Sequence, residues 1–206
     1  MLKMNNIIAE WENYIQKKLM PIIDSKIIEG NIYGKPNERN VCKLLRQKQK
    51  NIVDILSQND FDNVLEIGFN AGFSALLMLM SNPSIKLTCV DINMHKYTQV
   101  CFDQIKKDFN NIDIILDSSV NVLPKLKISN MKYDLIHIDG DHSLRGAKID
   151  IDNSLELSVS GSMLLIDDTN IGHINGLVDD LVNQEIVRNI DYHNSERYRH
   201  RCVQII

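Results

Sequence analysis

From residue 63 onward, short apolar runs alternate with stretches of helical periodicity, and this alternation constrains the fold more than any other feature. Strands are expected at Asn63–Ile67, Lys86–Asp91, Ile112–Leu116, Tyr133–Asp139 and Ser162–Asp167. Helices are expected between them, at Ser74–Met80, Tyr97–Phe109, Val120–Lys125 and Leu144–Ser158. Such alternation predicts a parallel sheet with helices on both faces. The last segment departs from it, because Glu185–His193 and Tyr198–Ile206 have the pattern of an antiparallel hairpin. We therefore predict an α/β, doubly wound, mostly parallel seven-stranded sheet with a C-terminal antiparallel hairpin.

The first sixty residues have the pattern of helices. One apolar face at helical spacing carries Ile7, Ile8, Trp11, Tyr14, Ile15 and Leu19, and a second carries Leu44, Leu45, Ile52, Val53, Ile55 and Leu56. Gly34 and Pro36, within Asn31–Asn37, predict a break between them. We expect an N-terminal helical extension over residues 1–60, packed on the core or serving as a lid, and an α/β domain over residues 61–206.

Composition excludes several classes of protein. A net charge of −4 argues against non-specific nucleic-acid binding as the main activity. No apolar run approaches the roughly 20 residues of a membrane span, and acidic residues interrupt the N-terminus before a secretory signal core forms. The four cysteines lack zinc-ligand spacing, which favours a reducing, cytoplasmic setting.

A glycine-containing turn follows the first expected strand, in V-L-E-I-G-F-N-A-G-F-S at residues 64–74. Gly68 allows a tight turn and Gly72 allows a ligand to approach the helix that follows, where free N–H groups favour a negative group. Asn70 occupies the middle glycine position of the dinucleotide motif, which disfavours an NAD-linked enzyme.

Acidic residues end the next two strands. Asp91 lies about 20 residues beyond the glycine turn, where a carboxylate accepts the hydroxyls of a ribose. Asp117 and Ser118 end the third strand and are placed to contact an adenine edge. Helix capping is the alternative role for each acid alone. All three strand ends should face one crevice.

As a set, these motifs resemble those of the class I S-adenosylmethionine-dependent methyltransferases, which have a Rossmann-like fold. The resemblance covers roughly residues 60–206. It implies that the cofactor is S-adenosylmethionine. It also implies that Asp91 binds the ribose and that Asp117 and Ser118 flank the adenine. The cofactor-binding residues expected on this basis are Glu66, Gly68, Asn70, Gly72, Ser74, Asp91, Ile92, Asp117, Ser118 and Asp139.

An acidic cluster is expected at the ends of the fourth and fifth strands. Asp139 is followed by Gly140, Asp141 and His142, and the next strand ends in Asp167 and Asp168. Neighbouring strand ends lie about 5 Å apart, so Asp139, Asp167 and Asp168 can converge on one point. Converging carboxylates repel one another unless a cation lies between them, and oxygen ligands suit Mg²⁺ or another divalent cation. Helix capping by Asp141 and Asp168 is the alternative.

The segment I-D-G-D-H-S followed by L-L-I-D-D resembles the metal-dependent O-methyltransferase branch, which includes catechol, caffeoyl-coenzyme A and macrolide-sugar enzymes. That resemblance assigns a metal to Asp139, Asp167 and Asp168. Two positions depart from the catechol enzymes. The later pair is Asp-Asp instead of Asp-Asn, and His142 stands where those enzymes carry lysine. Both departures favour an acceptor like a sugar or a natural-product precursor.

We therefore expect methylation of a small hydroxylated acceptor. A bound metal would orient the hydroxyl, with Asp139 and His142 as catalytic residues and His142 as the base. A loop-bonding role is the alternative for His142. His137 is expected in the core or behind the site, and His173 in a loop or the acceptor pocket. The alternatives are metal-independent or N-directed methylation, and a non-catalytic nucleotide-binding module.

Acceptor specificity is expected from Met1–Asp60 and Ile171–Glu185. The run at residues 192–201 is expected to be a solvated hairpin, with a subunit contact or an anion site as alternatives. A homodimer formed through the N-terminal helices is a further expectation.

Overall fold

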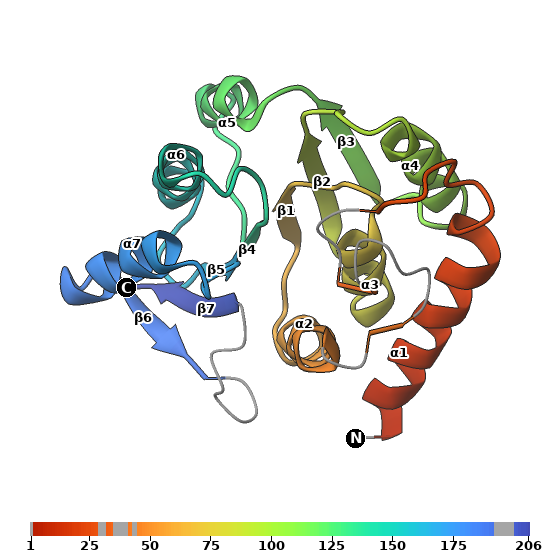
Figure 1. Ribbon diagram of the computed structural model, residues 1–206. Helices are drawn as coiled ribbons and strands as arrows, with labels where there is room; N and C mark the ends of the chain where they lie inside the picture. Colours follow the sequence, from red (N-terminus) through yellow and green to blue (C-terminus); the bar gives the residue numbers. More distant parts are fainter. Residues whose placement is uncertain (1, 29–31, 35–40, 43–44, 192–199) are drawn as a thin grey trace.

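The computed structural model describes residues 2–28, 32–34, 41–42, 45–191 and 200–206 (Figure 1). Its centre is a seven-stranded sheet with the order β3-β2-β1-β4-β5-β7-β6. The strands are β1 (Asn63–Ile67), β2 (Lys86–Asp91), β3 (Ile112–Leu116), β4 (Leu135–Ile138), β5 (Met163–Asp167), β6 (Val187–Ile190) and β7 (His200–Ile205). The predicted α/β, doubly wound architecture is confirmed.

The sheet is parallel from β3 to β5 and becomes antiparallel at its C-terminal edge. β7 pairs antiparallel with both β5 and β6, which confirms the predicted terminal hairpin. The residues that join β6 to β7, 192–199, lie outside the described residues. β4 is shorter than the predicted Tyr133–Asp139, because the Tyr133 N–H bonds to the Leu157 carbonyl, which follows a helix and is not part of a strand.

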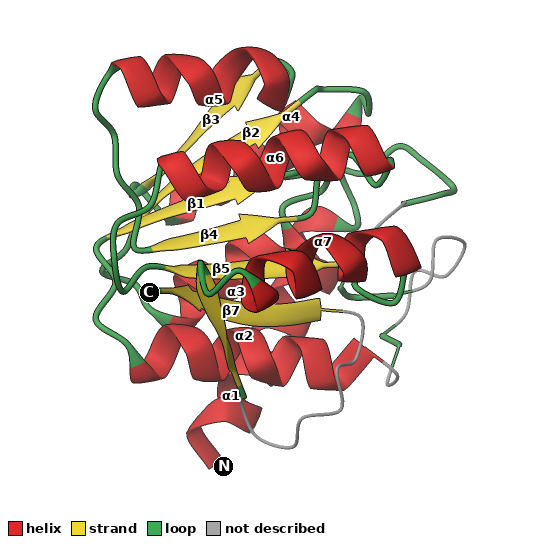
Figure 2. Ribbon diagram, turned by 90° about the vertical axis from the view of Figure 1, so that its left-hand side faces the viewer, coloured by secondary structure: helices red, strands yellow, loops and turns green. Residues whose placement is uncertain are grey.

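Helices cover both faces of this sheet (Figure 2). The helical elements are α1 (Leu2–Tyr14), the π-helix η1 (Ile15–Leu19), α2 (Arg46–Gln58), α3 (Phe73–Ser81), α4 (Tyr97–Asp108), α5 (Ser119–Ile128), α6 (Leu144–Glu156) and α7 (Gly172–Asn183). Side chains of α2, α3 and α4 share one apolar core with one face of the sheet, and those of α5, α6 and α7 form a second core with the other face. The central strands are therefore buried on both sides, as a parallel sheet requires.

The N-terminal helices are part of the first core. Ile8, Trp11, Ile15 and Leu19, which share the predicted apolar face, are all buried. The indole Nε1 of Trp11 donates a 2.8 Å hydrogen bond to the Phe73 carbonyl at the start of α3. Leu44, expected in the second helix, lies outside the described residues. Within the described part of the chain, no helix is long and apolar enough to cross a membrane.

Candidate active site

The strand order reverses between β1 and β4, and a cavity of about 520 Å³ opens at the carboxyl ends of these strands. In open α/β sheets, ligands bind at this switch point. The lining residues come from the ends of β1, β2 and β4 and from the starts of α5 and α6: Ile67, Gly68, Asn70, Val90, Asp91, Ile92, Met94, His95, Ser118, Ser119, Val120, Asp139, Gly140, Asp141, His142 and Gly146. Six of the ten expected cofactor-binding residues are among them: Gly68, Asn70, Asp91, Ile92, Ser118 and Asp139.

Gly68 brings the end of β1 against the end of β4. Its φ is +96°, and a Cβ atom at this position would lie 2.0 Å from the Asp139 carbonyl oxygen. Only glycine allows both this backbone conformation and this close approach. The turn therefore places the Gly68 backbone and Asp139 side by side in the cavity wall.

Asp91 holds the loops on either side of it. Its Oδ2 accepts a 2.7 Å hydrogen bond from the Asn70 N–H, and its Oδ1 accepts one of 2.7 Å from the Asn93 N–H. Carboxylate oxygens carry further lone pairs, so Asp91 retains acceptor capacity toward the cavity that it lines.

Four expected cofactor residues, Glu66, Gly72, Ser74 and Asp117, lie outside the cavity lining. Glu66 is fully buried, where His137 Nδ1 lies 3.1 Å from its Oε1. Gly72 (φ +73°) and Ser74 shape the start of α3. Asp117 accepts hydrogen bonds from the Ser118 N–H and the Asn121 side chain at the start of α5, but the N-cap residue of this helix is Ser118.

The cavity has an apolar rim that the sequence revealed only in part. Ile92, Met94 and Val120 are exposed large apolar side chains that line the cavity. His95, also in the lining, stacks on Tyr97 with its ring centroid 4.9 Å away. Of these residues only Ile92 was expected, because loop residues such as Met94 and His95 follow no periodic pattern.

The expected metal ligands lie in two overlapping groups. Among the described residues, His137, Asp139 and Asp167 offer ligand atoms within 4.8 Å of one another, and so do Asp139, His142 and Asp168. Asp139 belongs to both groups, but neither contains all three aspartates. The outer group lies beside the cavity, whereas Asp167 points toward the interior.

A lysine that the sequence analysis did not single out reaches this cluster. Lys48 of α2 is 5% exposed, and its Nζ forms a salt bridge with Asp167 Oδ2. Lys48 stands four residues before the fully buried Ile52, so helical spacing places it on a buried face. That spacing is the signal that could have revealed it.

His200 of β7 lies directly opposite Asp167 and is also buried. Burial lowers the His200 pKa to about 4, which makes the ring neutral. Arg201 is buried too, where it bonds to Asp179 and Asn189. The expectation of a solvated hairpin is therefore wrong for these two residues, and residues 192–199 lie outside the described part.

The pKa values show how the cluster shares its charge. Burial and the Asp167 charge raise the pKa of Asp139 to about 6. The pKa of His142 is raised to about 8 by its hydrogen bond with Asp139 and by the charges of the nearby carboxylates, which outweigh the lowering effect of burial. Burial alone would raise the pKa of Asp167, but Lys48, His200 and His137 together outweigh this effect, and the pKa is lowered.

The loop after β4 is held by its own polar residues. Ser143 is the N-cap of α6, with its Oγ accepting from the Gly146 N–H. Asp141 accepts from the Ser143 N–H and hydroxyl, so it supports the cap and is not itself the N-cap. His173, at the start of α7, lies with its Nε2 2.9 Å from the His142 carbonyl oxygen. Because of this contact, α7 steadies the backbone that presents His142.

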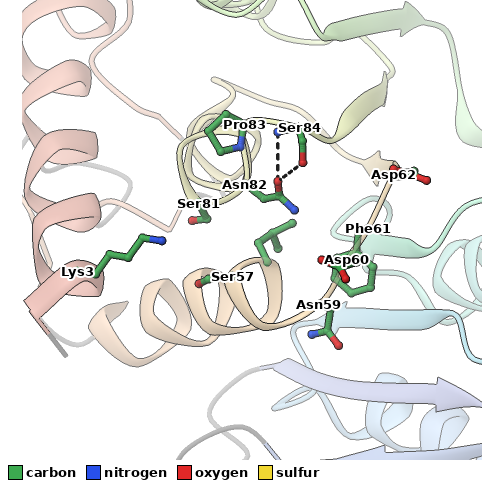
Figure 3. Close-up of a pocket in the computed structure, with 11 residues that line it drawn as sticks. Lys3, Ser57, Asn59, Asp60, Phe61, Asp62, Ser81, Asn82, Pro83 and Ser84 are labelled. Carbon is green, nitrogen blue, oxygen red and sulfur yellow. Dashed lines mark hydrogen bonds between the residues drawn. The ribbon is translucent and has the colours of Figure 1, made fainter.

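A second cavity, of about 490 Å³, opens at the amino end of β1 (Figure 3). Its wall includes Lys3 and a turn in which Asn82 accepts hydrogen bonds from the Ser84 N–H and hydroxyl. None of the expected site residues lines it.

The fold and the first cavity together define a class: doubly wound proteins that bind a ligand at the carboxyl edge of the sheet, where acids end successive strands. A family model described as "Methyltransferase domain" matches residues 65–169, just over half of the chain, and the protein belongs to this family. It is an S-adenosylmethionine-dependent methyltransferase. No curated protein sequence matches the chain.

Solved structures agree on the fold. An O-methyltransferase from Bacillus cereus in complex with SAH is 13% identical, with 100% of this chain and 91% of that chain covered at a TM-score of 0.65. The O-methyltransferase TomG from Streptomyces achromogenes, involved in tomaymycin synthesis and in complex with SAM, is 11% identical, with 97% and 89% covered at 0.65. The SAH-bound methyltransferase PaMTH1 of Podospora anserina is 11% identical, with 97% and 88% covered at 0.62.

Proposed function

We propose that this methyltransferase transfers the methyl group of S-adenosylmethionine to an oxygen of a small hydroxylated acceptor, with the help of a divalent cation. One observation carries the proposal. The residues suited to the cofactor and the Asp139–His142 pair line the same 520 Å³ cavity. A methyl donor and a proton acceptor would thus be held within reach of one acceptor molecule, and in-line displacement requires such alignment.

The cofactor would lie along the ends of β1 and β2. Asp91 offers its carboxylate to the ribose, and the Gly68 turn leaves room for the methionine part. The apolar rim of Ile92, Met94 and Val120 suits the flat faces of adenine, and Ser118 offers a hydroxyl to its edge. Glu66, Gly72, Ser74 and Asp117 would act indirectly, through the turns and helix starts that they shape.

His142 is suited to receive the acceptor's proton. Its Nε2 lies 3.4 Å from Asp139 Oδ1 and 3.3 Å from Asp168 Oδ2. Both carboxylates would stabilise the imidazolium that forms, which is why the pKa of His142 is raised to about 8. His142 is half-exposed, and the α6 cap and His173 hold its loop.

The donor set fits a divalent cation on its outer side. Asp139 and Asp168 supply hard oxygen ligands beside the cavity, and burial together with the Asp167 charge raises the pKa of Asp139, so a nearby cation would stabilise its carboxylate. A bound cation would lower the pKa of the acceptor hydroxyl and orient it. Asp167 completes the expected ligand set, but it already has Lys48 as a partner.

That ion pair favours a second candidate, metal-independent O-methylation. Lys48 already neutralises one carboxylate, and His142 contacts the other two. The two candidates differ in a measurable way, because chelation stops turnover only in the first.

The first test is calorimetric titration with S-adenosylmethionine and S-adenosylhomocysteine, in Mg²⁺ and in chelator. We expect micromolar binding, and Asp91→Asn should weaken it about 10- to 100-fold, the scale of a hydrogen bond to a charged group. Asp113→Asn on the neighbouring strand is the matched control, since Asp113 is exposed and pairs with Lys106. Equal losses in both variants would contradict the placement of the ribose.

Hydroxylated acceptors can then be screened with labelled S-adenosylmethionine. Label found on nitrogen alone would refute the O-methyl proposal, and cofactor binding without turnover of any acceptor class would favour a binding module.

The four buried, unpaired cysteines support the expected reducing, cytoplasmic compartment. The homodimer stays a prediction, as does the division into an extension over residues 1–60 and a methyltransferase domain over residues 61–206.

A further inference from the structure

Lys48 reaches the carboxylate cluster from the N-terminal helices. Its Nζ contacts Asp167, which is 119 residues away in the sequence, and the charges of Asp139 and Asp168 also act on it. α2 holds this lysine firmly, because Gln49 donates a 2.7 Å hydrogen bond to the Ile32 carbonyl and Ile52 is fully buried. The packing of α2 therefore fixes the position of Lys48 in the site, and Lys48 is not an exposed surface lysine.

The side chains around Asp167 indicate the role of Lys48. His200 faces Asp167 from β7 with its Nε2 2.8 Å from the Asn51 side chain, and His137 Nδ1 lies 3.1 Å from Glu66 Oε1. Lys48, by contrast, forms a salt bridge with Asp167 Oδ2, and this pair makes up the buried half of the cluster. Asp139 and His142 line the cavity, and Asp168 Oδ2 lies 3.3 Å from His142 Nε2 on the same side of the cluster.

We infer that Lys48 is a built-in cation of this site, which competes with a divalent metal for Asp167 and so weakens metal binding. The inference rests on the metal site proposed above. The metal would be held by Asp139 and Asp168, and Asp167 would become a ligand only when Lys48 withdraws. The N-terminal helices thereby set the metal affinity of a site built on the sheet.

The test is titration of the purified protein with Mn²⁺ alone, followed by electron paramagnetic resonance of the free ion. Lys48→Gln should bind Mn²⁺ at least tenfold more tightly than the wild type, because it removes a competing charge and frees Asp167. Lys50→Gln, which makes the same charge change on the same helix, and Lys48→Arg, which keeps the charge, should both stay within about threefold of the wild type. Saturating Mg²⁺ should also raise the melting temperature of Lys48→Gln more than that of the wild type.

A second variant keeps the test decisive if Lys48→Gln does not fold. Lys48→Gln combined with Asp167→Asn removes both charges of the pair. If Lys48 already keeps Asp167 from the metal, this double variant should bind Mn²⁺ within about threefold of the wild type. A loss of tenfold or more would show that Asp167 ligates metal in the wild type, and would overturn the inference.

The outcomes separate this inference from the proposed function. Equal or weaker Mn²⁺ binding by Lys48→Gln overturns the inference, while wild-type binding leaves the metal proposal intact. If neither protein binds Mn²⁺, both the inference and the metal-assisted mechanism fail. Titration of the same samples with S-adenosylhomocysteine reports cofactor binding independently of the metal.

Discussion

At the scale of single residues, the site depends on backbone contacts that only glycine permits. Gly68 lies so close to the Asp139 carbonyl that any side chain would displace the end of β4. Since Asp139 is shared by both groups of candidate ligands, this contact links the cofactor turn to the acidic cluster. The glycine was recognised from the sequence as a turn residue, but its neighbour across the sheet was not.

Gly68→Ala should lower the free energy of unfolding by about 3 kcal/mol or more, because backbone strain adds to overpacking. Denaturant unfolding followed by circular dichroism measures this change. Gly161→Ala is the matched control, since Gly161 has a similar φ of +91° but no atom within 4 Å of the position that a Cβ would occupy. It should lose only the strain contribution, about 1–2 kcal/mol. Equal losses would mean that the contact with Asp139 is unimportant.

His142 should make stability depend on pH. Its pKa in the folded protein, about 8, lies above its ordinary value of 6.5, so the stabilisation is complete below pH 6.5 and is lost as pH rises through 8. In chelator, the free energy of unfolding should therefore fall between pH 6.5 and 8, and His142→Gln should reduce that fall, with the remainder due to His137, whose pKa is also raised by Glu66. Asp139 titrates near pH 6, below this window. His95→Gln is the control, and an unchanged decline in His142→Gln would refute the assignment.

At the scale of elements, the periodicity of the sequence predicted the positions of the helices more accurately than their ends. α5 begins at Ser119 and continues through Pro124 to Ile128, beyond the predicted Val120–Lys125. The C-cap residue Ser129 donates to the Lys125 carbonyl, so the last turn closes despite the proline. α7 forms in a segment that was expected only to influence specificity, and its first turn contacts the His142 loop.

The most consequential element is α2. Its apolar face was recognised, but a lysine on that face is found buried, as is Gln49. Buried polar side chains need partners, and these come from Asp167 and the Ile32 carbonyl. α2 therefore contributes to the site as well as to the core.

At the scale of the whole molecule, two apolar cores lie on opposite faces of one sheet, and the N-terminal helices belong to the first of them. α1 packs against both α2 and α3 (Figure 1). The indole of Trp11 in α1 donates its hydrogen bond to Phe73 at the start of α3. A helical extension that shares its core with the sheet should not unfold separately.

Trp11 is the single tryptophan of the chain and reports directly on this packing. Denaturant transitions followed by its fluorescence and by far-UV circular dichroism should coincide, with one midpoint. A fluorescence transition at lower denaturant would show that the N-terminal helices open first, as a detachable lid would. The same pair of measurements with S-adenosylhomocysteine present should move both midpoints upward together.

The sequence alone determined the features that arise from local interactions. Strand–helix alternation, the Gly68 turn and the acids at strand ends follow from short-range sterics and periodicity, so the α/β, doubly wound fold could be predicted, as could seven of the sixteen residues that line the cavity. Because parallel strands present their carboxyl ends at one edge, Asp139, Asp167 and Asp168 could also be expected near one another. The tertiary structure decided which side chains pack against them. Three residues contact the cluster from separate elements: Lys48, His200 and His137. Glu66 is buried beside His137 and does not line the cavity. Such pairings depend on how a helix packs over a sheet and on which charges must be balanced away from water, and no local pattern encodes either.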